Sequence, residues 1–345
     1  LGTFSVEIEK LDLANEARVC DIFSLYLTTL STESEILTGI AHYLVLKSNG
    51  FNPQGFSAFI KNSTKSDAEL FQGIFEKTVH IIGTCGNYKL PILEVYQSLL
   101  EHIPSKNEKL VMPLARSVGQ LISWSDDQPS VAPLVPVLET IKNLLITQQW
   151  VFSQYTIETL FPLCCKTVSQ CNPNNETELG NIIEVTTQLL SIVLNFHSFR
   201  LTNRYHLINS IICFYMDVLS NSSHVSVNAV QNVSRLIINY CEPSTSSTVS
   251  KNSDAGLHSK VSLLKKNLRR SVGPVLLKYI KLCVSNFNPL SNSVRKELIG
   301  SIYSVFALLS QDELVTINAS LDHAGKTYFK KIYEDFKTNG KWRED

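Results

Sequence analysis

The sequence predicts an all-α protein built as an irregular α-solenoid of HEAT-like or armadillo-like helical repeats, ending in a C-terminal capping helical segment. Three observations predict this fold. Apolar residues recur at helical spacing along the 345-residue chain. Strict apolar and polar alternation almost never persists long enough for a strand. Short polar segments rich in Pro, Gly, Asn and Ser separate the helical stretches, as between stacked helix pairs.

The length of the chain favours two domains or an elongated array, because 345 residues exceed the usual size of one compact core. We expect a helical-repeat array over residues 1–195 and a C-terminal helical domain over residues 196–345. No repeat consensus recurs at a fixed period, so a compact helical bundle is the competing architecture.

The N-terminal helices are predicted from apolar stripes between turn signals. Gly50 and Pro53 close the second helix by supplying positions that a helix cannot continue through. Pro91 suits the first turn of the fourth helix, where its missing amide would have no partner. Pro104 ends that helix. Helices are expected over residues 6–30, 34–47, 67–83, 90–103, 110–124 and 131–145.

The same pattern continues in the second half of the chain, where Thr202 or Asn203 is expected to cap one helix start. Helices are expected over residues 150–168, 176–196, 200–219 and 225–241. Residues 242–257 are rich in Ser and Thr, which cannot repay the entropy of ordering. We therefore predict a flexible surface loop at about 242–257.

The last hundred residues contain the densest local signals. Ser310 and Glu313 have the spacing of a capping box, which predicts a helix start, and Asp322 suits the cap of a final helix. Apolar residues on that helix share one face, which we expect to dock on the helix containing Phe306 and to cap the array. The candidate partner or packing surface is Phe329, Tyr333, Phe336 and Trp342.

The composition limits the chemistry that the chain can perform. The net charge is zero, so any nucleic-acid contact must be local. The eight cysteines lie mostly in apolar runs and are read as reduced core thiols. Cys164, Cys165 and Cys171 cluster without a histidine pair at ligand spacing, so no metal site is expected. No nucleophile lies at a recognised spacing from a base, and no phosphate-binding loop follows Gly83. A protein without enzymatic activity or cofactor is expected.

The sequence also bears on location. The N-terminus lacks the basic and apolar regions of a signal peptide, and Leu1 in place of Met indicates a piece of a longer protein. The most apolar run, residues 181–197, is interrupted by Glu184, so no membrane span is expected. We expect a soluble intracellular protein.

The strongest charge feature is a basic helix near residue 265. Apolar Leu264 and Leu268 alternate there with a basic face, whose members are neighbours at three- and four-residue spacing. The candidate residues for binding RNA or an acidic partner are Lys260, Lys265, Lys266, Arg269 and Arg270, with Arg200 and Arg204 as a smaller second cluster. Such residues bind phosphate through salt-dependent contacts. The alternative is a solvated helix face.

Several segments of the last third resemble a known family. The segments are FRLTNRYHL at 199–207, LIINYCEPS at 236–244, LLSQDEL at 308–314, NASLD at 318–322, YEDFK at 333–337 and GKW at 340–342. In order and spacing they resemble the C-terminal domain of the Urb/Npa nucleolar family, second member, over roughly residues 196–342. Asn203 and Tyr205 depart from the family pattern, where Gly and His are expected.

The resemblance implies a non-catalytic nucleolar scaffold in ribosome biogenesis and rRNA processing. Such proteins work in the nucleus on early precursors of the large ribosomal subunit. The implied partners are the first Urb/Npa member, a DEAD-box helicase, small accessory factors and pre-ribosomal RNA within the pre-ribosome. The alternative is a helical-repeat adaptor that binds proteins without an RNA role, which the zero net charge favours.

Overall fold

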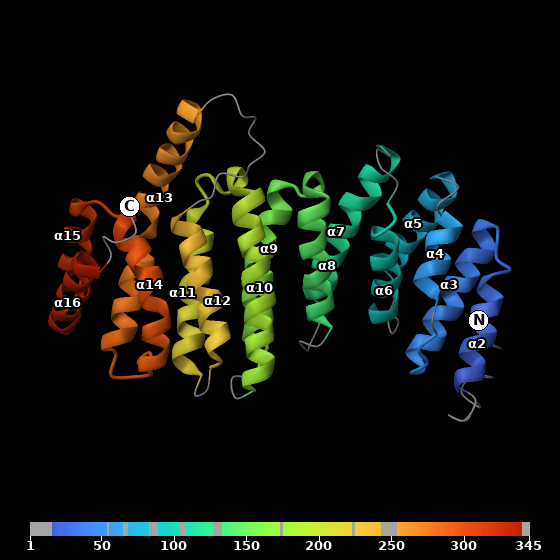
Figure 1. The fold of residues 1–345 in the computed structure, drawn as a ribbon, viewed down its shortest axis with the longest axis horizontal. Helices are drawn as coiled ribbons and strands as arrows, with labels where there is room; N and C mark the ends of the chain where they lie inside the picture. Colours follow the sequence, from blue (N-terminus) through green and yellow to red (C-terminus); the bar gives the residue numbers. More distant parts are fainter. Residues whose placement is uncertain are drawn as a thin grey trace. The chain divides into compact units, whose positions relative to one another are not determined.

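The computed structural model describes residues 16–53, 55–64, 68–82, 84, 89–103, 108–126, 133–172, 175–222, 225–242 and 254–339. Every regular element among these residues is a helix, which confirms the all-α prediction (Figure 1). The chain divides into two compact units, and the division falls within α8, between Thr140 and Ile141. The domain boundary expected at residues 195 and 196 rests on the family resemblance and stays a prediction.

The first unit contains α2 to α7 and the beginning of α8. Its elements are α2 (Glu16–Leu27), α3 (Glu33–Ser48), α4 (Phe56–Thr64), α5 (Ala68–Ile82), α6 (Lys89–Leu100), η2 (Glu108–Leu110), α7 (Val111–Asp126) and the first part of α8 (Leu134–Thr147). Helices alternate between two rows, α2–α4–α6 and α3–α5–α7, so each packs on the next but one. Phe71, Phe75 and Tyr96 are fully buried between the rows.

The helix α4 is absent from the sequence-based prediction, which left residues 54–66 without an element. Phe56, Phe59 and Ile60 are buried at positions i, i+3 and i+4 of this helix. Phe56 stacks on Tyr43 of α3 with ring centroids 3.9 Å apart. A helix of nine residues is too short to form without such packing, and its periodic signal is correspondingly weak.

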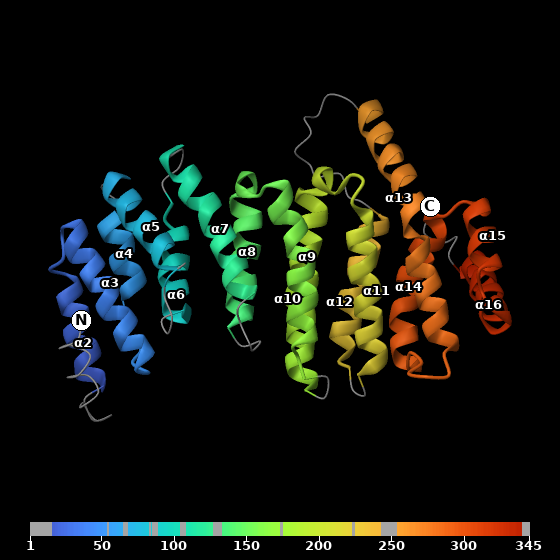
Figure 2. The same cartoon turned by 180° about the vertical axis from the view of Figure 1, so that it is seen from behind.

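The second unit contains the rest of the chain. Its elements after α8 are η3 (Gln149–Val151), α9 (Gln154–Ser169), α10 (Glu176–Phe196), η4 (Ser198–Leu201), α11 (Tyr205–Asn221), α12 (Val227–Cys241), α13 (Asp254–Val284), α14 (Asn292–Leu308), α15 (Gln311–Ala319) and α16 (His323–Asn339). The rows α9–α11–α13 and α10–α12–α14 repeat the alternating pattern, and the helices run up and down in turn (Figures 1 and 2). Tyr215, Tyr240 and Tyr279 are among the buried residues between them.

Three sequence-based boundaries need correction. The helix expected from residue 150 begins after Ser153, whose hydroxyl caps the amide of Thr156, and Trp150 lies in η3 instead. The helix expected from residue 200 begins at Tyr205, and neither Thr202 nor Asn203 caps it, since the N-cap position is Arg204. Of the loop expected at 242–257, residues 254–257 belong to α13, and residues 243–253 lie outside the described residues.

The C-terminal segment folds as the sequence predicts. Ser310 and Glu313 form a reciprocal capping box at the start of α15. The carboxylate of Asp322 accepts a hydrogen bond of 2.8 Å from the amide of Gly325 and so caps α16. Helix α16 packs on α13, α14 and α15. The capping segment is therefore attached to the ends of both helix rows of the second unit.

Helix α10 is long and apolar enough, by composition, to cross a membrane. Half of its apolar window is buried inside the protein, and the helix packs on α9 and α12. The bent pair α14 and α15, with 119° between the two helices, passes the same test only if taken as one span. A core helix explains the composition of α10.

Candidate interaction edge of the second unit

Two basic segments that are about sixty residues apart in sequence meet at one edge of the second unit. Here α10 and α12 end while α11 and α13 run in the opposite direction (Figure 1). Leu201 and Tyr205, beside Arg200 and Arg204, line a small open cavity of about 30 Å³ together with Leu268 of α13. We call Arg200, Arg204, Lys265, Lys266, Arg269 and Arg270 the basic edge.

The basic face of α13 is fixed by what the opposite face buries. Leu268 and Val272 are buried, and the three- and four-residue spacing then directs their polar neighbours outward. Lys265, Lys266 and Arg270 are exposed and form no ion pair with any residue that the structure describes. Their charges are therefore available to an anionic partner.

Arg269 has a structural contact that the sequence does not reveal. Its Nε donates a hydrogen bond of 2.9 Å to the carbonyl oxygen of Leu308, the last residue of α14. The last carbonyls of a helix lack partners within the helix, and a cation there also opposes the negative end of the helix dipole. Arg269 thus stabilises the end of α14 and joins it to α13.

The second basic cluster is partly neutralised. The Nε of Arg204 lies 2.9 Å from Oε1 of Glu158 on α9. The side-chain hydrogen bond from Gln154, followed by the one from Arg204, lowers the pKa of Glu158 and keeps it ionised. Gln154 also donates to the carbonyl oxygen of Arg200 over 2.7 Å. These contacts fix η4 against the start of α9.

The cavity of the basic edge is mostly apolar but contains two phenol groups. Tyr205 and Tyr240 are buried, their rings are 6.5 Å apart, and neither hydroxyl has a hydrogen-bond partner. Burial raises the pKa of both, so the hydroxyls remain protonated. A cavity of about 30 Å³ is too small for a side chain or a base, so partners at this edge must bind the surrounding surface.

The aromatic stripe of α16 serves packing. Phe329 is buried and Tyr333 and Phe336 are half-buried, and all three rings lie 5.5–5.7 Å from the ring of Phe306 on α14. The docking on the helix containing Phe306 agrees with the prediction. The part of Tyr333 that remains exposed contacts Lys337, whose Nζ lies 4.4 Å from the ring centre.

Two predicted site residues cannot be placed. Trp342 lies outside the described residues, and so does the side chain of Lys260, although its backbone belongs to α13. The binding roles of the other predicted residues stay predictions.

Exposed aromatic residues at the same edge were not among the sequence-based candidates. Trp150, Tyr155, Phe196 and Phe199 are 52%, 75%, 37% and 66% exposed. They lie in η3, the first turn of α9, the last turn of α10 and η4. We call these four residues the aromatic row. In the sequence these four residues lie in apolar runs like those of core residues. Their exposure depends on where each helix begins or ends, which the sequence pattern does not give.

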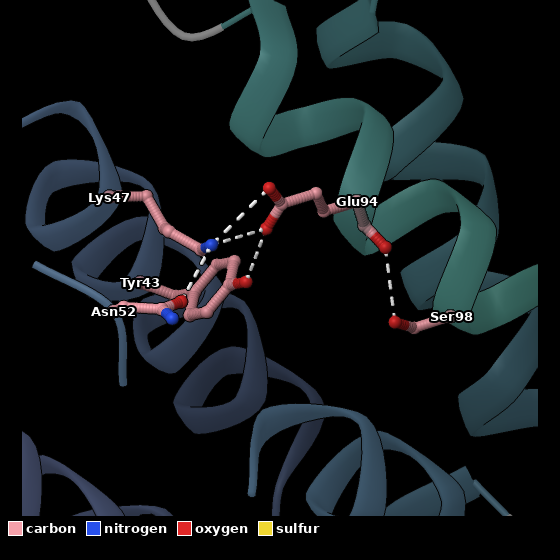
Figure 3. Close-up of polar contacts among 5 residues, drawn as sticks. All are labelled: Tyr43, Lys47, Asn52, Glu94 and Ser98. Atoms are coloured by element: carbon pink, nitrogen blue, oxygen red, sulfur yellow. Dashed lines mark hydrogen bonds and ion pairs between the residues drawn. The ribbon is translucent and has the colours of Figure 1, made fainter. Parts of the chain in front are cut away.

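A polar cluster in the first unit contains residue types that occur in active sites. The hydroxyl of Tyr43 donates to Oε2 of Glu94 over 2.7 Å, and Nζ of Lys47 lies 2.9 Å from the same oxygen (Figure 3). Lys47 also donates to Asn52. Burial and then the bond to Glu94 raise the pKa of Tyr43, so the phenol stays protonated. The cluster satisfies its own charges and joins α3 to α6.

The described cysteines lack the features of reactive or metal-binding thiols. Burial raises the pKa of the thiols of Cys164 and Cys241, which disfavours the reactive thiolate. Within the described ranges, no group of three or more His, Cys, Asp or Glu side chains could hold a metal ion. The cysteine cluster therefore has the character of core thiols.

Comparison with known proteins gives one match. A family model described as the Urb2/Npa2 family matches residues 135–345. The match begins earlier than the resemblance carried by the motifs and includes nearly the whole second unit. No curated protein and no solved structure matches the chain.

Proposed function

Because this chain belongs to the Urb2/Npa2 family, whose members are ribosome biogenesis factors not known as enzymes, we propose that it is a non-catalytic nucleolar scaffold. In this role it binds partner proteins and pre-ribosomal RNA in early precursors of the large ribosomal subunit and supports pre-rRNA processing. The proposed partners are the first Urb/Npa member, a DEAD-box helicase and small accessory factors.

The packing pattern supports the scaffold role. In each unit a helix packs on the next but one, which is how the repeats of an α-solenoid bury their apolar faces. Repeats of this kind expose long surfaces for their size, so several partners can bind at once. We infer that each unit is a segment of an irregular α-solenoid.

The basic edge carries the proposed RNA contact. Lys265, Lys266 and Arg270, which form no ion pair with a described residue, concentrate positive charge on a chain whose net charge is zero. Phosphate contacts by such groups supply most of the affinity for RNA and weaken as salt rises. The exposed lysines of α16, Lys330 and Lys331, lie outside the basic edge and have no assigned role in binding, so they provide a control.

The second candidate function is a protein adaptor without an RNA role. The zero net charge of the chain favours it, because a protein adaptor needs no positive field to attract phosphate. An adaptor of this kind would bind proteins with little dependence on salt.

Salt-dependent RNA binding tests the proposal. The variant K265E/K266E/R270E removes three phosphate contacts but keeps Arg269, which holds the end of α14. Each contact contributes about 0.7 to the slope of log K against log salt, so the slope should become shallower by about 2. The control K330E/K331E reverses two charges elsewhere, against three in the first variant, and should leave the slope within about 0.5 of wild type, on the order of a single contact or less. An equal slope for wild type and the first variant would contradict an RNA contact at the basic edge.

A further inference from the structure

We infer that the aromatic row and the basic edge together bind unpaired RNA nucleotides, with the exposed rings stacking on bases and the cations contacting the phosphates. The inference rests on the proposed function and specifies the structure of the RNA. It assigns a role to Trp150, Tyr155 and Phe199, which the sequence did not single out.

The rings are exposed despite the cost of leaving them in water. Of the five exposed aromatic side chains among the described residues, four belong to the aromatic row, and the other is Phe287. Exposed apolar groups scattered singly are common, but a concentration at one edge indicates an interaction surface. At this edge the concentrated groups are aromatic rings, which expose π faces.

Side-chain contacts bring the segments that carry the aromatic row together. Phe152, which follows η3, lies 5.8 Å from His197, and His197 lies 6.3 Å from Phe199. Gln154 bonds to the carbonyl oxygen of Arg200 and so brings the first turn of α9, with Tyr155, against η4. The segment η3, which contains Trp150, is therefore a neighbour of η4, which contains Phe199.

Two of the rings are held in place before any ligand binds. The indole Nε1 of Trp150 donates to Oε1 of Gln148 over 3.0 Å, which limits rotation of the ring. The guanidinium of Arg200 lies 5.0 Å from the ring centre of Phe199. A planar guanidinium on an aromatic ring is itself a surface on which a base can stack.

Charge decides between RNA and protein as the occupant. The cavity lined by Ser198, Leu201 and Leu268 joins η4 to α13, and the exposed Lys265 and Lys266 lie within one helical turn of Leu268. Glu158, an acidic group that joins α9 to this surface, is already paired with Arg204. Aromatic rings beside unpaired cations match an anionic ligand with planar bases. In an RNA duplex the bases are stacked on each other, so only unpaired nucleotides offer their faces.

The experiment compares binding of the full chain to two probes: a labelled 12-nucleotide single-stranded RNA and a blunt duplex of the same length. W150A and Y155A each remove one stacking ring and should weaken single-strand binding about five- to 100-fold. Duplex binding, which uses phosphates alone, should change less than about twofold.

Conservative variants separate stacking from other roles. W150F keeps a π face and should retain single-strand binding. W150L keeps apolar volume without a π face and should lose binding as W150A does. Circular dichroism and thermal melting should match wild type for all of them, because the replaced rings are largely exposed.

The possible outcomes distinguish this inference from the proposed function. Retained single-strand binding by W150A and Y155A, with loss in K265E/K266E/R270E, would overturn the stacking surface and leave RNA binding intact. Retained binding by W150L would likewise overturn it, in favour of an apolar protein contact. No binding of wild type to either probe would overturn the RNA role itself, and the inference with it.

Discussion

Asn203 illustrates how one backbone angle decides where a helix begins. Its φ is +65°, a left-handed conformation between η4 and α11 that side chains other than Gly, Asn and Asp rarely adopt. The chain therefore turns there instead of entering the helix, and α11 starts at Tyr205. Gly would adopt this angle freely, and Asn adopts it with little strain.

His197 is a buried polar residue without a polar partner. It is 1% exposed, neither ring nitrogen forms a hydrogen bond, and its ring packs against Phe152 and Phe199. Burial, followed by the nearby charge of Arg200, lowers its pKa from 6.5 to about 4. The folded protein therefore holds His197 neutral where an unfolded chain would protonate it.

The pH dependence of stability should follow from this shift. Above pH 6.5 His197 is neutral in both states, and its contribution is complete. As the pH falls from 6.5 towards 4, His197 is protonated in the unfolded state but stays neutral in the folded state. The free energy of unfolding therefore decreases. At pH 5 the loss should be about 2 kcal/mol relative to pH 7, measured by urea denaturation.

The variant H197F is the matched control for that measurement. Phenylalanine keeps the ring packing and removes the titrating group, so its stability should fall less between pH 7 and pH 5. His42, whose pKa is also lowered by burial, contributes a residual dependence from the first unit. Lowered carboxylate pKa values, such as about 2 for Glu35, matter only below about pH 4.5. An H197F profile identical to wild type would contradict the assignment.

At the scale of elements, prediction succeeded where local signals and packing agree. Helix α10 begins and ends as predicted, because Asn175 caps it and a long apolar stripe runs to Phe196. The capping box at Ser310 likewise fixed the start of α15. Helix α4 was missed because its few apolar residues become helical only through contact with α3. Tertiary contact, absent from a sequence window, supplies the missing stability.

The attachment of α16 gives a test at the same scale. F329A should lower the free energy of unfolding by about 3–5 kcal/mol, because a buried ring that contacts Phe306 and Tyr333 is replaced by a cavity. The control F287A removes a ring that is 86% exposed and should change stability by less than about 0.5 kcal/mol. Equal denaturation midpoints for the two variants would show that the α16 stripe does not stabilise the fold.

At the scale of the whole molecule, the sequence predicted the helical class, the family and the basic residues, but not which of them act together. Arg204 and Arg269 read as free cations, yet one pairs with Glu158 and the other holds the end of α14. Those contacts join residues 39 to 46 positions apart. Long-range contacts of this kind depend on the packing of complete helices, which no local pattern contains. For the same reason the sequence did not predict that the residues of the aromatic row are exposed at one edge.

The central claim is that the chain is a scaffold that contacts pre-ribosomal RNA through the basic edge. Its most direct test is association with precursors of the large ribosomal subunit. The measurement is sedimentation of the full-length protein from nuclear extract, comparing wild type, K265E/K266E/R270E and the control K330E/K331E. At physiological salt the first variant should no longer sediment with the precursor particles, because three phosphate contacts are lost. Wild type and the control should still sediment with them. Equal sedimentation of all three proteins with the precursor particles would contradict the account.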